Sequence, residues 1–175
     1  TAVWTGSRMI VWGGTDFATQ AFANGGSYDP GSDTWAPVSS VGAPPGRREH
    51  TAVWTGSRMI VWGGISSGFD GLASGGVYDP IADSWVPTAT AGAPSGWRKH
   101  VAVWTGQEVI VWGGVTSGDY LRGRRGGRYD PGSDTWTLMS DDGGIVVRRR
   151  PAAAWTGREF VFWGGGGSAN FPQGT

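Results

Sequence analysis

Cysteine is absent from this chain of 175 residues, and lysine occurs only once, as Lys99. Without cysteine there can be no disulfide, no thiolate metal site and no cysteine nucleophile. Basic and acidic residues number 14 each, so the formal net charge is zero. No global field therefore draws the chain to nucleic acid or to an anionic membrane, and neither is an expected partner. No run of 18 apolar residues occurs, so no transmembrane helix is expected.

Helical periodicity is missing as well, since no stretch of ten residues shows it. Glycine, by contrast, is abundant at 33 residues, and tryptophan follows with 12. So much glycine could indicate disorder, but disordered chains are poor in aromatic residues, and 13% of this chain is Phe, Trp or Tyr. The composition predicts a folded all-β protein with many turns.

The sequence repeats itself with a period of about 50 residues. Residues 1–14 and 51–64 are identical, residues 101–114 keep ten of the fourteen letters, and residues 152–165 keep seven. A second block follows in the first three units, as GGSYDPGSDTW at 25–35, GGVYDPIADSW at 75–85 and GGRYDPGSDTW at 126–136.

Each repeat reads as four short strands separated by turns. In the first unit these are TAVWT, RMIVW, SYD and TWAPV, and the Asp-Pro-x-x-Asp stretch between the last two is a turn sequence. RMIVW is apolar on both alternating faces, so both faces should be covered. Four strands in 50 residues, with a large aromatic residue in most strands, are typical of one blade of a β-propeller.

The repeat resembles the kelch repeat in two features. Four apolar residues precede a double glycine (MIVWGG, MIVWGG, VIVWGG, FVFWGG), and six residues separate a tyrosine from a tryptophan (Tyr28 and Trp35, Tyr78 and Trp85, Tyr129 and Trp136). The resemblance implies one partial propeller of about 3.5 four-stranded antiparallel blades, at residues 1–50, 51–100, 101–151 and, incompletely, 152–175. It also implies that the first strand of each blade lines a central channel. The loops from second to third strand, and from fourth strand to the next blade, would share the face where kelch propellers bind partners.

Kelch rings have five to eight blades, so these repeats alone would leave an apolar blade face open at each end. Either the repeats belong to a longer parent chain that completes the ring, or copies associate to cover the open faces.

Basic residues recur just before each first strand, in GRREH at 46–50, GWRKH at 96–100 and VRRRP at 147–151. In a ring, the equivalent residues Arg48, Arg98 and Arg149 would converge near the mouth of the channel. The planar guanidinium binds carboxylate or phosphate with two hydrogen bonds, and kelch adaptors that bind acidic peptides use arginine at this place. The alternative is that each arginine bonds to a neighbouring loop and holds the blades together.

The loop after the second strand of the third unit adds a further basic cluster, made of Arg122, Arg124, Arg125 and Arg128. The corresponding loops at 15–24 and 65–74 have no arginine. Loops that vary over a constant framework are where recognition is usually found. A solvated Gly/Arg loop is the alternative.

His50 and His100 are equivalent, and Trp97 replaces Arg47 and Arg148 at its position. The histidines are candidates for ligand contact or for hydrogen bonds between blades, and Pro151 at the third position disfavours a metal. Trp97 could stack on a sugar or a peptide, or pack within its loop.

These features predict a non-catalytic recognition module that binds an acidic peptide or other anionic group on the arginine-bearing face, without a cofactor. Two alternatives remain: a carbohydrate-active propeller, sugar-binding or mutarotase-like, using Arg48, Arg98 and His100, or a self-associating scaffold. The copper radical oxidases of the kelch family need a cysteine that is absent here. Partners are expected to be a protein or peptide, or alternatively a glycan. With arginine in place of lysine, the composition resembles that of exported bacterial proteins, so a secreted or periplasmic location is expected.

Overall fold

A computed structural model describes residues 1–16, 20–68, 70–115, 126–140 and 148–166. These residues form fourteen strands and no helix. The strands are β1 (Ala2–Trp4), β2 (Met9–Trp12), β3 (Gly25–Asp29), β4 (Thr34–Val38), β5 (Thr51–Trp54), β6 (Met59–Trp62), β7 (Gly75–Asp79), β8 (Ser84–Pro87), β9 (Val101–Trp104), β10 (Val109–Trp112), β11 (Gly127–Asp130), β12 (Thr135–Leu138), β13 (Ala152–Trp155) and β14 (Phe160–Trp163).

The strands make three sheets of four strands and one of two, and within each sheet the strands follow chain order. All pairings are antiparallel, and the register repeats from unit to unit: Met9 pairs with Tyr28 and Tyr28 with Trp35, as Met59 pairs with Tyr78 and Tyr78 with Trp85. The all-β, four-stranded blade architecture predicted from the repeat is therefore confirmed, with three complete sheets and a two-stranded fourth.

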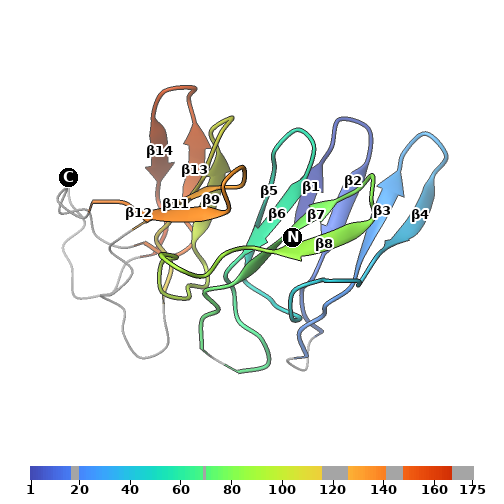
Figure 1. Ribbon diagram of the computed structural model, residues 1–175, viewed down its shortest axis with the longest axis horizontal. Coiled ribbons are helices and arrows are strands. Elements are labelled where there is room, and N and C mark those ends of the chain that lie inside the picture. The colour runs from blue at the N-terminus through green and yellow to red at the C-terminus, as the bar shows by residue number, and fades with distance from the viewer. Residues whose placement is uncertain (17–19, 69, 116–125, 141–147, 167–175) are drawn as a thin grey trace.

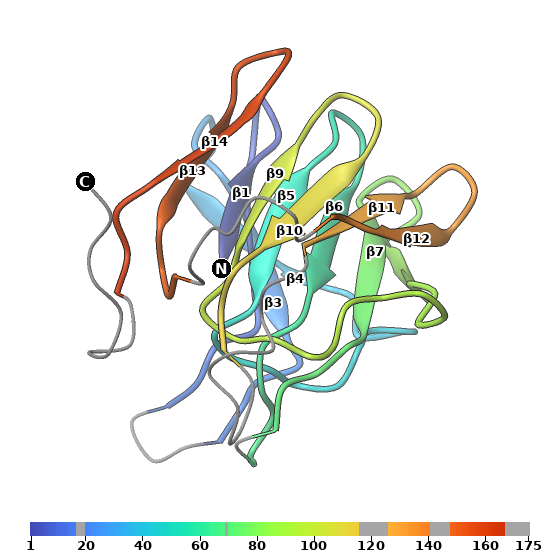
Figure 2. The ribbon, with the colours of Figure 1, turned by 90° about the vertical axis from the view of Figure 1, so that its left-hand side faces the viewer.

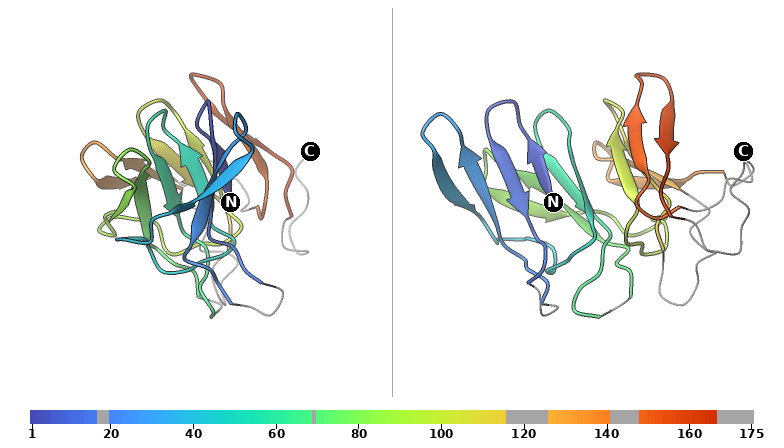
Figure 3. Two further views of the ribbon diagram at one scale, coloured as in Figure 1. Left: turned by 90° about the vertical axis from the view of Figure 1, so that its right-hand side faces the viewer. Right: turned by 180° about the vertical axis from the view of Figure 1, so that it is seen from behind.

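The sheets stand one after another in an arc, from β1–β4 on the right of Figure 1 to β13–β14 on the left. The first strands of neighbouring units contact each other, β1 with β5, β5 with β9 and β9 with β13, so they line the inner side of the arc (Figure 2). Hairpin tips gather at one end of the sheets and the long connections at the other, which Figure 3 shows from behind. The two ends of the sheets thus form two different faces of the molecule, one made of hairpin tips and one made of long connections.

Burial follows the position of each blade in the arc. Every residue of β6 and β10 is buried, because sheets cover both faces of these strands. In β2 only Ile10 and Trp12 are buried, and in β14 Trp163 is 84% exposed. The prediction that the second strand is covered on both faces thus holds for the middle blades, while the outer blades have a sheet on one side only.

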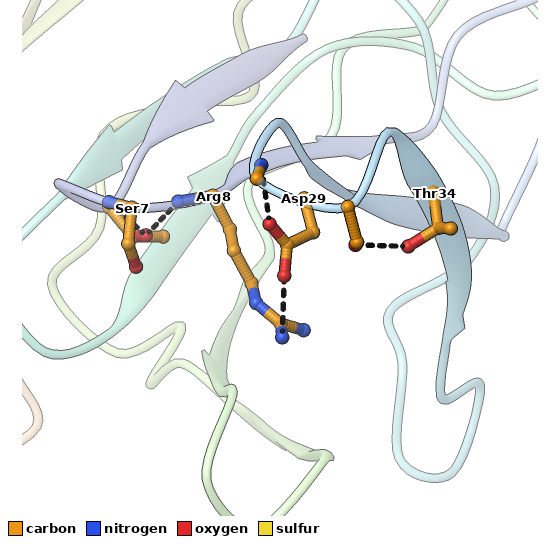
Figure 4. Close-up of polar contacts among 7 residues, drawn as sticks. Ser7, Arg8, Asp29 and Thr34 are labelled. Carbon is orange, nitrogen blue, oxygen red and sulfur yellow. Dashed lines mark hydrogen bonds and ion pairs between the residues drawn. The ribbon is translucent and has the colours of Figure 1, made fainter.

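Polar side chains organise the hairpin tips, and Figure 4 shows Ser7, Arg8, Asp29 and Thr34 of the first blade. Tyr28 donates a hydrogen bond to Asp33, whose backbone has φ +54°, and Asp29 accepts one from the Gly31 amide. Asp29 also pairs with Arg8 across the tips, at 3.1 Å. Because a short polar side chain tolerates a left-handed backbone, the turn sequence fixes this geometry in all three units.

A polar clamp, made of one tryptophan and one aspartate side chain, joins the second and the third blade each to the blade before it. The Trp85 indole donates to the Ser39 carbonyl at 3.0 Å, and Asp83 accepts from the Ser39 amide at 2.9 Å. One blade further, Trp136 and Asp134 hold the carbonyl and amide of Ala89 in the same way. The blade interface is therefore a repeated structure with its own hydrogen bonds, in addition to its apolar core.

Candidate functional site

The segment before each first strand is wedged between the glycine pairs of two successive blades. A Cβ on Gly13 of the first blade would lie 2.8 Å from Cε1 of His50. A Cβ on Gly64 of the second blade would lie 2.5 Å from the Arg48 carbonyl oxygen, and this glycine has φ +85°. No larger residue fits at either place, so the repeated double glycine is what allows residues 47–50 to lie between the blades.

Arg48, Arg98 and Arg149 occupy matching places along this wedge. Each backbone forms an isolated antiparallel bridge to the residue after the double glycine of the next unit, namely Ile65, Val115 and Gly166. The wedge lies at the end of the sheets opposite the hairpin tips (Figure 1). The structure thus brings the three arginine positions to one face of the molecule, the face of the long connections.

The next residue of each segment has an unusual backbone. Glu49, Lys99 and Arg150 all have positive φ, at 57°, 60° and 51°, although none is glycine. The Lys99 amide donates to the Glu49 carbonyl at 3.2 Å, and the Arg150 amide donates to the Lys99 carbonyl at 2.8 Å. These bonds link three successive units, and their cooperation offsets the cost of the left-handed conformation.

Glu49 is the centre of an ion cluster at this place. Its carboxylate lies 3.5 Å from Nη1 of Arg98, 3.4 Å from Nζ of Lys99 and 3.3 Å from Nη2 of Arg150. The side chains of Glu49, Arg98 and Lys99 are 18%, 20% and 24% exposed, so the cluster is only partly screened by solvent. The carboxylate of Glu49 therefore pairs with three cationic side chains from two different segments.

Arg48 is less satisfied than Arg98. Within the described residues it has no ion-pair partner, whereas Arg98 pairs with Glu49; the Nε atoms of both arginines are buried without a hydrogen bond. Within residues 48–50, 98–100 and 149–150, cationic side chains outnumber carboxylates. Arg122, Arg124 and Arg125 of the variable loop lie outside the described residues.

Arg128 differs from its sequence-based assignment. It lies in β11 rather than in the variable loop. Its guanidinium pairs at 3.5 Å with Glu108, the residue directly before β10 of the same sheet. The strand extends to this residue because Arg128 pairs in register with Ile110.

Arg47, Trp97 and Arg148 share one position between blades, and the first two are fully buried. Arg47 donates to the carbonyls of Gly63 and Ser74 at 3.0 and 2.6 Å, and Arg148 donates to that of Gly164 at 3.2 Å. Burial lowers the pKa of Arg47 to about 10. Trp97 is 1% exposed and meets Trp62 edge-on, at 6.2 Å between ring centroids. This burial favours the packing role of Trp97 over a stacking platform for a ligand.

His50 and His100 bond to the start of the preceding first strand. Nε2 of His50 lies 2.7 Å from the Thr1 hydroxyl, and Nε2 of His100 lies 2.8 Å from the Thr51 hydroxyl. Burial lowers the pKa of His50 to about 3 and that of His100 to about 4, so both rings are neutral at pH 7. This arrangement favours hydrogen bonding between blades.

Both histidines border a shallow cavity on the inner side of the arc. It has a volume of about 310 Å³ and is otherwise lined by threonine, alanine and valine from the first strands, including Thr51 and Ala102. In the part of the chain that the structure describes, no group of three or more His, Asp or Glu side chains could hold a metal ion. The cavity offers small apolar and hydroxyl groups beside the neutral imidazoles.

A larger cavity lies between the first two blades on the hairpin-tip side. It has a volume of about 590 Å³, and Ser27 and Ala36 are part of its lining. These two residues pair across β3 and β4, at the place where the next blade has the pair Val77 and Val86. Val77 belongs to the apolar core between the second and third blades. Small residues at this pair therefore leave the first interface incompletely filled.

Sequence reasoning missed the role of Glu49. The residue breaks the basic character of GRREH, and its equivalents are Lys99 and Arg150, so a charge reversal at one repeat position was the available signal. The contacts themselves connect residues 49 and 101 positions apart, which no local pattern reveals.

Comparison with protein families gives one match that spans the repeats. The model of the KLHDC2/KLHL20/DRC7 Kelch-repeats domain matches residues 1–174. No curated protein matches the chain. Among the described residues, none forms a helix of the length and apolar character needed to cross a membrane.

Proposed function

Since the chain belongs to the kelch-repeat family, whose domains generally mediate protein–protein interaction, we propose that it is a non-catalytic recognition module for an acidic peptide or another anionic group. The proposed site lies on the face of the long connections, and it consists of Arg48, Arg98 and Arg149 together with Lys99 and Arg150. Arg48 would make the first contact, because it has no ion-pair partner within the described residues.

The observation that carries this proposal is the charge imbalance of the site. In residues 48–50, 98–100 and 149–150, five side chains are cationic and Glu49 carries the one carboxylate. The segments are anchored by backbone bonds to the next blade, so the guanidinium groups start from an ordered backbone. Less conformational entropy is then lost when a carboxylate or phosphate binds.

The proposal is tested with a fluorescein-labelled tetraglutamate peptide as probe, and fluorescence anisotropy as the measurement. Replacing Arg48, Arg98 and Arg149 together with alanine should weaken binding at least about tenfold, because charge-assisted hydrogen bonds are lost. The matched control replaces Arg8, Arg58 and Arg158, which belong to the hairpin tips at the opposite end and change the net charge equally. Equal affinity of the two triple variants would contradict the proposed site.

A second candidate function, association through an open blade face, rests on the clamp residues of the first blade. Trp35 is 57% exposed, whereas its equivalent Trp85 is 4% exposed and bonded to the previous blade. Asp33 keeps its bond to Tyr28 but has no counterpart of the Asp83–Ser39 bond in the described residues. We expect the partner of this face to be another repeat of the same kind, either in a longer parent chain or in a second copy.

A further inference from the structure

We infer that Glu49 acts as a built-in competitor of the anionic ligand, so that its carboxylate occupies the cationic site that an acidic peptide would otherwise fill. This inference rests on the proposed function and adds to it a residue that sets the affinity of the site. Glu49 itself is not part of the binding surface: it neutralises the surface and must be displaced.

The contacts of Glu49 are those expected of a bound carboxylate. Oε1 is shared between Lys99 and Arg150, and Oε2 faces Arg98. The partners come from two later segments of the chain, so the carboxylate bridges blades in the way that a ligand on the axis would. All three distances lie between 3.3 and 3.5 Å, longer than the 2.7–2.9 Å of a strong charge-assisted hydrogen bond. The carboxylate is therefore held loosely enough to be replaced.

The backbone explains why Glu49 reaches this place. With φ +57° it is the first of three equivalent left-handed residues, whose carbonyl and amide groups are bonded in series along the inner side of the arc. Lys99 and Arg150 at the equivalent positions add positive charge, and only the first segment, at Glu49, carries the opposite sign. The glutamate is thus placed in the middle of the site by the same repeated geometry that places its cations.

Release of the carboxylate costs little at Arg150, because this side chain is 72% exposed and remains hydrated when Glu49 leaves. A peptide carboxylate that replaces Glu49 would regain the contacts with Arg98 and Lys99, and we expect a second anionic group of the peptide to pair with Arg48. An isolated single carboxylate would gain little, because it only exchanges one anion for another. The site should therefore favour ligands with two or more adjacent anionic groups.

The test compares the wild-type protein with Glu49→Gln, using the tetraglutamate probe in fluorescence anisotropy at low salt. Gln keeps the length of the side chain and removes its charge, so the affinity should rise about tenfold, as expected for removing one partly buried competing charge. Glu159→Gln in the opposite hairpin tip makes the same change of net charge and should leave the affinity within about twofold.

Each outcome decides one of the two ideas. If the wild-type protein binds and Glu49→Gln binds equally, the role of Glu49 is overturned and the arginine site stands. If both substituted proteins gain affinity alike, only the net charge matters, and the role of Glu49 is again overturned. If neither the wild-type protein nor Glu49→Gln binds, the proposed function and this inference both fail. Glu49→Asn provides a second neutral variant if Gln does not fold, because Asn adopts a left-handed backbone more readily.

Discussion

The hydroxyl of Thr51 lies 2.8 Å from Nε2 of His100, a residue 49 positions later at the start of the next blade. The same pair occurs between Thr1 and His50, at 2.7 Å. Each ring also meets a tryptophan edge-on, Trp62 for His100 and Trp12 for His50. A neutral imidazole is therefore part of the blade interface, which makes the interface sensitive to protonation.

Acid should destabilise the protein through these histidines. Burial lowers the pKa of His100 to about 4, below the ordinary value of about 6.5 that holds in the unfolded chain. Below pH 6.5 the unfolded state takes up a proton that the folded state refuses, so stability is lost as the pH falls from about 6.5 towards 4. The slope is at most about 1.4 kcal/mol per pH unit for each such histidine. Above pH 7 this contribution is constant.

The variant His100→Gln checks this assignment. Glutamine can bond to Thr51 but does not titrate, so urea denaturation at pH 7.5, 6.0 and 5.0 should show a shallower loss of stability than in the wild-type protein. An identical pH slope in the two proteins would contradict the assignment.

Trp85 and Trp35 provide a matched pair for the blade interface. Trp85→Ala removes a side chain that is 4% exposed, and it should lower the free energy of unfolding by about 3–5 kcal/mol. Trp35→Ala at the equivalent place removes a side chain that is 57% exposed, and it should cost less than about 1 kcal/mol in the monomer. Chemical denaturation at low protein concentration measures both. Equal losses would mean that the face bearing Trp35 is covered.

Association through the open face should depend on Trp35. Replacing Trp35 with aspartate puts a charge where another repeat would pack, so light scattering should show a lower average mass than for the wild-type protein. Ile81→Asp changes an apolar residue of the hairpin tip between β7 and β8, 94% exposed, and is the control for placing a charge at any exposed apolar side chain. A monodisperse wild-type monomer of 18.4 kDa would end the case for self-association of these repeats.

The cavity between the first two blades should be filled by the residue that the second blade has at the equivalent position. Ser27→Val copies Val77 of the next blade, and it should raise the free energy of unfolding by about 1 kcal/mol through added apolar burial. The reverse change, Val77→Ser, should lower it by about 1–2 kcal/mol, because Val77 is 6% exposed in the core. Thermal denaturation of the two variants measures both effects. A destabilised Ser27→Val protein would mean that the pair Ser27–Ala36 needs its hydroxyl.

Much of the fold could be predicted from residue patterns because its causes are local. The alternation in RMIVW, the Asp-Pro-x-x-Asp turn and the position of Tyr28 against Trp35 each act within one repeat. The fate of the candidate site residues could not be predicted in the same way. Arg47, Arg48 and Trp97 belong to similar basic segments, yet Arg47 is buried against backbone carbonyls, Trp97 is buried against Trp62, and Arg48 has no ion-pair partner in the described residues.

The sequence by itself determined the blade, its period and the equivalence of Arg48, Arg98 and Arg149, because repetition of letters imposes repetition of local geometry. Only the tertiary structure decided which side chains face the interface between blades and which face the channel. It also brought Glu49 to Arg98, Lys99 and Arg150, at separations of 49 to 101 residues. Such contacts depend on how one blade is set against the next, and the hydrogen bonds and glycine pairs between blades fix that arrangement.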